Sequence, residues 1–212
     1  AAADTWLANL AGQRLPVDAP DQSGSPNGRA HLAARWPGIP TAARAEALLE
    51  QCQARLGPGP DSHVVHGDFW AGNILTIPGR GVTGVVDWEH ARFGGDCLAD
   101  WVRFALAYTL YLDRHTAPGR AVSGHAGLRA GADGDPVRWL LTQGSWYADV
   151  VAAFVGRGLA LTGRHPDLWR VALLAGLGEV AATADEPGFA AQHIELVTGL
   201  AEVALTGPRG SR

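Results

Sequence analysis

The chain has 212 residues and a formal net charge of −4, and this acidic balance gives no electrostatic support to a nucleic-acid partner. A hydrophobic fraction of 47% and a charged fraction of 18% are typical of a globular protein and exclude a disordered one. No apolar run approaches membrane-spanning length, so no membrane partner is expected, and two separated cysteines, Cys52 and Cys97, suit buried thiols in a cytoplasmic setting.

The basic residues are unusual because all 17 of them are arginine. The chain contains neither lysine nor methionine, and it begins at Ala1. From this we expect a piece of a longer protein. A composition rich in alanine, glycine and arginine suggests a high-GC genome, which permits a role in antibiotic resistance or antibiotic biosynthesis.

The first third of the chain predicts two helices separated by a long loop. Residues 4–11 can form a helix capped by Asp4 or Thr5, and Thr41 is expected to cap a second helix over 41–56, where apolar residues recur at helical spacing. Five prolines between them predict loop over 13–40, with the tract 18–29 poorly ordered.

The central stretch, 64–96, holds short apolar runs and the rest of the chain is helical in pattern. Val64-Val65 leads into a polar loop, and residues 74–77 and 82–86 predict a hairpin around the turn 78–81. Asp96 is expected to open a helix over 98–113, and a glycine-rich break follows at 118–136. Further helices are expected over 137–161, 165–183 and 188–205. These elements predict an α+β, mainly α domain with a leading segment (1–63), a central hairpin region (64–96) and a helical subdomain (97–206).

Four polar residues of the central stretch form a constellation suited to phosphoryl transfer: His66, Asp68, Asn73 and Asp87. Such chemistry needs one carboxylate to accept the proton of an attacking hydroxyl. It also needs an amide oxygen and a second carboxylate, because Mg²⁺ prefers hard oxygen ligands. The residues Asp68, Asn73 and Asp87 supply these groups in that order.

The motifs resemble those of the aminoglycoside phosphotransferase/choline kinase family, relatives of the protein kinases. HGDFWAGN is similar to the family's catalytic loop, His-Gly-Asp followed four residues later by Asn, and VVDWE is similar to its magnesium-binding segment. GGDCLADW resembles the Gly-Asp-Pro-x-x-Asp-Leu segment, with Cys97 in place of the usual proline and Trp101 in place of the usual leucine. Three motifs in order are a specific signal.

The resemblance implies a role for each matching residue. Asp68 would be the catalytic base, and Asn73 and Asp87 would be magnesium ligands, with ATP as phosphoryl donor. Leu75 and Val86 would line the floor under the adenine ring. His66, Asp96 and Asp100 would support the catalytic loop.

The resemblance also implies that the acceptor is a small hydroxylated molecule: an aminoglycoside or other antibiotic, an amino sugar, a sugar or a choline-like alcohol. Aromatic and acidic residues of the helical region are the candidates for binding it, although at helical spacing aromatics are more often core. They are Trp139, Trp146, Tyr147, Asp185 and Glu186.

A complete kinase of this kind has an N-terminal lobe with a strand-borne lysine on the phosphates. This chain has no lysine and no glycine-rich hairpin before Val64, so it resembles a C-terminal lobe alone. Alone it is expected to bind ATP–magnesium poorly and to turn over negligibly.

Two other classes of function are compatible with parts of the pattern. A non-catalytic pseudokinase lobe acting as a binding or regulatory module would explain the missing lobe, but it has no need of Asp68, Asn73 and Asp87 together. A metal-dependent hydrolase could reuse the carboxylates, but the sequence offers no His-rich or two-metal ligand set.

Overall fold

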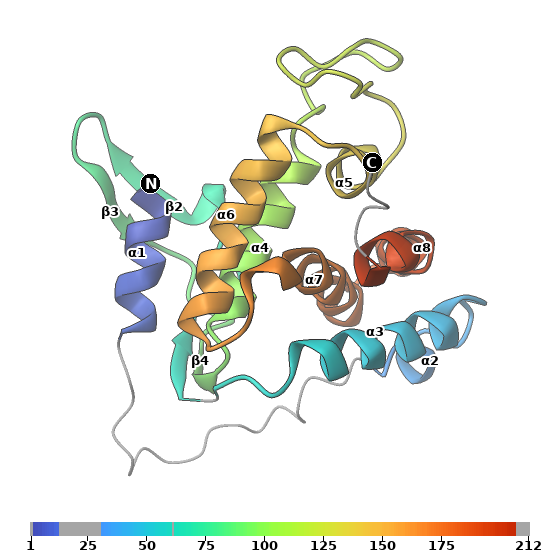
Figure 1. Cartoon of the computed structure of the whole chain (residues 1–212), viewed down its shortest axis with the longest axis horizontal. Coiled ribbons are helices and arrows are strands. Elements are labelled where there is room, and N and C mark those ends of the chain that lie inside the picture. Colours follow the sequence, from blue (N-terminus) through green and yellow to red (C-terminus); the bar gives the residue numbers. More distant parts are fainter. Residues whose placement is uncertain (1, 13–30, 61, 207–212) are drawn as a thin grey trace.

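A computed structural model describes residues 2–12, 31–60 and 62–206, so the tract 18–29 lies outside the described residues. The fold is α+β and mainly helical, as predicted (Figure 1). The strands are β1 (His63–Val65), β2 (Ile74–Ile77), β3 (Gly81–Val85) and β4 (Arg92–Gly95), and η1 (Ala71–Asn73) and η2 (Pro166–Leu168) are 3₁₀ turns. The helices are α1 (Ala2–Ala11), α2 (Leu32–Arg35), α3 (Ala42–Leu56), α4 (Leu98–Leu110), α5 (Asp135–Thr142), α6 (Trp146–Leu161), α7 (Trp169–Thr183) and α8 (Pro187–Thr206). None of the described helices is long and apolar enough to span a membrane.

The strands form two small antiparallel sheets. β2 and β3 make the predicted hairpin, in which Ile74 lies opposite Val85 and Leu75 opposite Gly84. β1 pairs with β4, so the segment before the catalytic loop is joined to the segment just before α4. The polar stretch between β1 and β2 is thereby fixed at both ends by backbone pairing.

The helical body is organised around α7, which is buried on nearly all sides. Helices α3, α4, α6 and α8 pack against it (Figure 1). Glycines permit the close approach: a Cβ at Gly176 would lie 2.2 Å from Val102 of α4, and a Cβ at Gly178 would lie 2.3 Å from Leu49 of α3. Since side chains in a packed core cannot move far, alanine at either position would force α7 away from its neighbours.

Helix α1 lies beside the hairpin and contacts β1, β3 and α6. Its Trp6 ring stacks on the buried ring of Phe69, with centroids 5.2 Å apart and an interplanar angle of 11°. The catalytic loop is therefore clamped between α1 on one side and α4 on the other.

Several predicted boundaries were wrong. The expected helix 137–161 is two helices, because residues 143–145 break it and the Ser145 hydroxyl caps α6 by accepting from the Ala148 N–H at 3.1 Å. The helix expected over 98–113 ends at Leu110. The loop predicted over 13–40 contains the short helix α2, and β4 was not predicted. Thr41 precedes α3, but its side chain makes no capping bond.

Candidate active site

The catalytic loop is held by the carboxylate of Asp100, from the first turn of α4. The backbone N–H of His66 donates to one oxygen at 2.7 Å, and that of Gly67 donates to the other at 2.9 Å. Asp100 is only 1% exposed, and this burial raises the pKa of its carboxyl, against which the two backbone bonds act. Both oxygens of this side chain are therefore used to shape the loop.

The buried ring of His66 joins the two halves of the site. Its Nε2 lies 3.0 Å from the carbonyl oxygen of Val86, and its Nδ1 lies 3.3 Å from the N–H of Asp68. Because a carbonyl only accepts and an N–H only donates, these partners assign the proton to Nε2. The imidazole thus connects the residue before Asp87 to the backbone of Asp68.

Gly67 allows the loop 86–92 to pass close by. Its φ is +84°, which favours glycine, and a Cβ there would lie 2.3 Å from the carbonyl oxygen of His90. The second residue of the His-Gly-Asp motif is therefore required by backbone conformation and by space.

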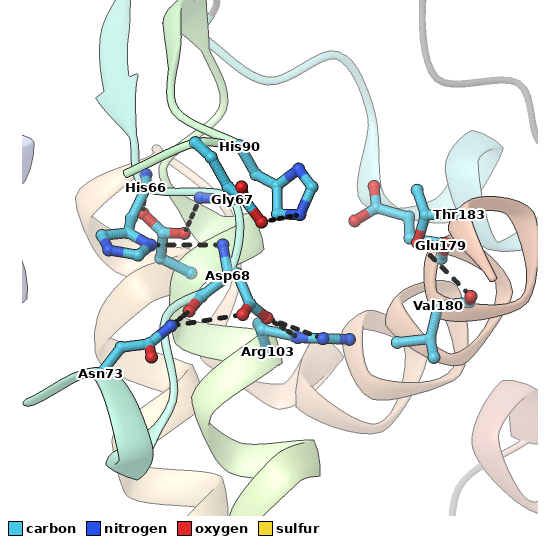
Figure 2. Close-up of polar contacts among 11 residues, drawn as sticks. His66, Gly67, Asp68, Asn73, His90, Arg103, Glu179, Val180 and Thr183 are labelled. Atoms are coloured by element: carbon cyan, nitrogen blue, oxygen red, sulfur yellow. Dashed lines mark hydrogen bonds and ion pairs between the residues drawn. The ribbon is translucent and has the colours of Figure 1, made fainter. Parts of the chain in front are cut away.

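Both carboxylate oxygens of Asp68 have partners (Figure 2). The guanidinium of Arg103, on α4, donates to Oδ1 from Nε at 3.1 Å and from Nη2 at 2.7 Å. The amide of Asn73 donates from Nδ2 to Oδ2 at 3.2 Å and to the backbone carbonyl of Asp68 at 2.9 Å. Asp68 is thus oriented from two elements that are distant in sequence.

Asn73 and Asp87 lie at the same end of the hairpin. Asn73 directly precedes β2, and its backbone carbonyl accepts from the Val86 N–H at 3.0 Å, so Asp87 follows immediately beside it. Asp87 is exposed and has a φ of +65°, the one positive φ of a non-glycine residue in the described part of the chain. Such strain is characteristic of functional sites.

The donors at this end of the hairpin fit a magnesium ion. The Asn73 amide nitrogen faces Asp68, so its two bonds leave the side-chain oxygen unused, and Asp87 adds an exposed carboxylate. Among the described residues no group of three or more His, Cys, Asp or Glu could hold a metal by itself. That suits Mg²⁺, which proteins commonly hold through one or two side chains, with phosphates and water as the other ligands.

Leu75 and Val86, predicted to lie under the adenine, are exposed apolar side chains at 50% and 41%. Leu75 pairs with Gly84, and alternation along the strand brings Val86 to the same side as Gly84. The two residues therefore share one apolar face of the hairpin.

Asp96 contacts a different part of the molecule from the one expected. Its Oδ2 pairs with Arg164 at 2.6 Å, and its Oδ1 accepts from the Leu98 N–H at 3.0 Å at the start of α4. Neither contact reaches the catalytic loop, so the prediction that Asp96 anchors this loop was wrong. Of the two aspartates, Asp100 is the one that bonds to the loop.

The candidates for acceptor binding are dispersed. Trp139 and Tyr147 are buried, and their rings stack with centroids 6.1 Å apart, whereas Trp146 is 58% exposed. Asp185 and Glu186 are exposed just before α8 and make no hydrogen bond or ion pair with the catalytic loop. The structure thus brings the three aromatic residues together, since Trp146 also packs on Tyr147 at 5.7 Å, but it does not join the two acidic residues to them.

Arg103 is the residue of the site that sequence reasoning missed. It lies three residues after Asp100, on the same side of α4, so one helix face supplies both the loop anchor and the partner of Asp68. A charged residue at that helical spacing from a motif aspartate was the available signal.

Comparison with known proteins identifies a family. A family model described as the phosphotransferase enzyme family, APH, matches residues 6–140, which is more than half of the chain and includes the catalytic loop, the hairpin and α4. No curated protein and no solved structure matches the chain. The resemblance inferred from the three motifs is confirmed. The chain belongs to the phosphotransferase enzyme family, whose activity is phosphoryl transfer to small molecules.

Proposed function

We propose that this chain is the protein-kinase-like catalytic lobe of an ATP- and Mg²⁺-dependent O-phosphotransferase that phosphorylates a hydroxyl of a small molecule. The observation that carries the proposal is the orientation of Asp68 by Arg103 and Asn73, beside the hairpin end that presents Asp87. Membership of a phosphotransferase family supports the reaction class.

Asp68 is the group that handles the acceptor. As the acceptor oxygen bonds to the γ-phosphorus and the bond between that phosphorus and the leaving ADP oxygen breaks, the hydroxyl proton passes to an Asp68 carboxylate oxygen. Arg103 and Asn73 fix the direction of that carboxylate before the acceptor arrives. A preset direction is valuable because phosphoryl transfer depends mainly on positioning.

Asn73 and Asp87 would hold the magnesium ion, which neutralises charge on the phosphates when it is bound. Asp87 is available for this task because it is exposed. The apolar face formed by Leu75 and Val86 would receive the adenine ring, since an exposed aliphatic surface next to a phosphate site suits a planar base.

The other half of the nucleotide site is proposed to come from an N-terminal lobe outside these 212 residues. The basic residues here are all arginine, so a phosphate-binding lysine must be supplied from elsewhere. The chain alone should therefore bind ATP–Mg²⁺ weakly and turn over negligibly. Stoichiometric phosphorylation by the 212-residue chain alone would refute this part of the proposal.

Substitution Asp68→Asn in the protein that carries both lobes tests the function. It keeps the size of the side chain but removes the proton acceptor, so transfer should fall by about 10²- to 10⁴-fold. ATP–Mg²⁺ binding, followed by calorimetry, should change little. The matched control is Asp149→Asn, an exposed carboxylate on α6, which should transfer normally. Near-normal turnover of Asp68→Asn would remove Asp68 from the role of base.

A further inference from the structure

A half-buried ring of the catalytic loop, Trp70, adjoins three exposed aromatic rings near the carboxyl end of α4. Trp70, two residues after Asp68, stacks on Tyr111 with ring centroids 6.0 Å apart and an interplanar angle of 20°. Tyr108 stacks on the buried Tyr147 at 6.3 Å, and Trp146 packs against the same ring at 5.7 Å. We call Trp70, Tyr108, Tyr111 and Trp146 the aromatic platform.

The platform faces solvent, yet its rings are held in place. Tyr108, Tyr111 and Trp146 are 53%, 43% and 58% exposed. The Trp146 indole donates to the carbonyl oxygen of Gly124 at 2.9 Å, and the hydroxyl of the underlying Tyr147 lies 3.0 Å from that of Thr109. Clustered exposed rings mark binding surfaces, and rings that are already fixed lose little entropy when a ligand binds.

The platform begins at the reacting group. Arg103 lies on α4 and Tyr111 directly follows that helix, eight residues further along, which is about 12 Å at the rise of a helix. Phe104 connects the catalytic loop to the platform, because its ring packs on Phe69 of that loop at 5.7 Å and on Tyr108 at 6.5 Å. The carboxyl end of α4 also lies beside the amino end of α6 (Figure 1). A ligand of two or three rings on this surface can therefore place a hydroxyl at Asp68.

The charges around the platform disfavour a cationic ligand. Arg103 is already neutralised by its ion pair with Asp68, and Arg114 is a cation that lies on the platform itself. The guanidinium of Arg114 already lies over the ring of Tyr111, 4.5 Å from its centroid, where a ligand ammonium would otherwise bind. The exposed carboxylate of Glu179 lies outside the platform. It belongs to α7 and points toward the segment that carries His90 (Figure 2).

We propose that the acceptor is an uncharged, hydroxylated ring compound, such as a neutral sugar or glycoside, whose ring faces lie on the aromatic platform while one hydroxyl reaches Asp68. This inference rests on the proposed function and narrows its acceptor class. The C–H faces of sugar rings and the faces of aryl groups both stack on tryptophan and tyrosine, whereas an ammonium group would meet the guanidinium of Arg114.

Binding of a matched pair of probes to the 212-residue chain tests the charge preference. Phenyl β-D-glucoside and its 2-amino-2-deoxy counterpart differ by one ammonium group, and binding can be followed by tryptophan fluorescence and by NMR. The neutral glucoside should bind more tightly. Tighter binding of the aminated probe, lost in Glu179→Gln, would overturn the proposal, and so would the absence of saturable binding of the glucoside.

Variants of the platform test its location. Tyr111→Ala and Tyr108→Leu should each weaken glucoside binding by about two- to tenfold, as expected for the loss of one stacked ring. Phe189→Ala removes an exposed ring on α8 and should have no effect. Unfolding curves identify any variant that has lost its structure, and Tyr108→Leu retains apolar surface in case Tyr111→Ala is unstable. Unchanged binding in both folded platform variants would overturn the proposal.

Asp68→Asn separates this inference from the proposed function. The variant removes the proton acceptor and leaves the four platform rings in place, so phosphoryl transfer should fall much further than the affinity for phenyl β-D-glucoside. If binding follows the platform but the two-lobe protein transfers no phosphate to any acceptor, the proposed function fails and the platform stands. If Asp68-dependent transfer occurs only to aminated acceptors, the proposed function stands and the platform inference fails.

Discussion

The two halves of α4 serve the site in different ways. The amino-terminal half presents Asp100 and Arg103, whose charged groups make short, directed bonds to the catalytic loop. The carboxyl-terminal half presents Tyr108, and Tyr111 directly follows it; the rings of both offer apolar area rather than directed bonds to that loop. Hydrogen bonds from charged groups depend on geometry, so a substitution at one of them should have a large effect. A surface of stacked rings should lose affinity for its ligand in small steps as single rings are removed. If the proposed roles hold, one helix separates the residues that position Asp68 from those that bind the acceptor.

Asp100→Ala should give the largest effect, because it removes the acceptor of two backbone donors at a buried position. Leaving the His66 and Gly67 N–H groups without a partner should reduce the free energy of unfolding by about 2–5 kcal/mol. Urea denaturation measures this change. The exposed control Asp149→Ala should stay within about 0.5 kcal/mol of the parent. An equally small change in Asp100→Ala would show that α4 does not hold the loop.

The same residue predicts a pH dependence of stability. Burial raises the folded-state pKa of Asp100 above its ordinary value of 3.8, so the folded state keeps the proton longer than the unfolded state. Its contribution to stability is therefore full below pH 3.8 and decreases as the pH rises through the raised folded-state pKa. The free energy of unfolding of the parent relative to Asp100→Asn should fall across that window. If the free energy of unfolding of the parent relative to Asp100→Asn instead rises with pH, the pKa of Asp100 is not raised in the folded state.

Arg103→Gln tests the positioning of Asp68 and should have a smaller effect. Without the two bonds to Oδ1 the carboxylate loses its fixed direction, so kcat should fall by about tenfold to a hundredfold while the KM for ATP changes little. Arg103→Lys retains the charge but not the planar fork, and it should recover part of the activity. A change confined to KM, or equal losses in both variants, would argue against positioning.

Trp146→Ala should have the smallest effect, because Trp146 lies at the far end of the aromatic platform. The KM for a neutral ring-bearing acceptor should rise by about two- to threefold, with kcat unchanged, as expected for a single peripheral ring contact. Steady-state kinetics of the two-lobe protein measure both constants. A large fall in kcat would mean that the aromatic platform also positions the reacting groups.

The sequence motifs predicted the hairpin and the residues that surround Asp68 better than they predicted the helical body. Short apolar runs and a tight turn determine a hairpin locally, so 74–77 matched β2. The break at 143–145 was missed because apolar spacing continues across it and only the Ser145 cap marks it. Arg103, β4 and the stacking of Trp70 on Tyr111 depend on tertiary contacts between separated segments, which periodicity does not encode.

The ring of His66 has a mechanical consequence for catalysis. One nitrogen is bonded to the carbonyl of Val86 and the other to the N–H of Asp68, so the imidazole is a spacer of fixed length between the two loops. A movement that displaces Asp87 must therefore carry Asp68 with it. The two carboxylates proposed to accept the proton and to hold magnesium would therefore move together, and a closing motion around a bound nucleotide would have to occur elsewhere in the molecule.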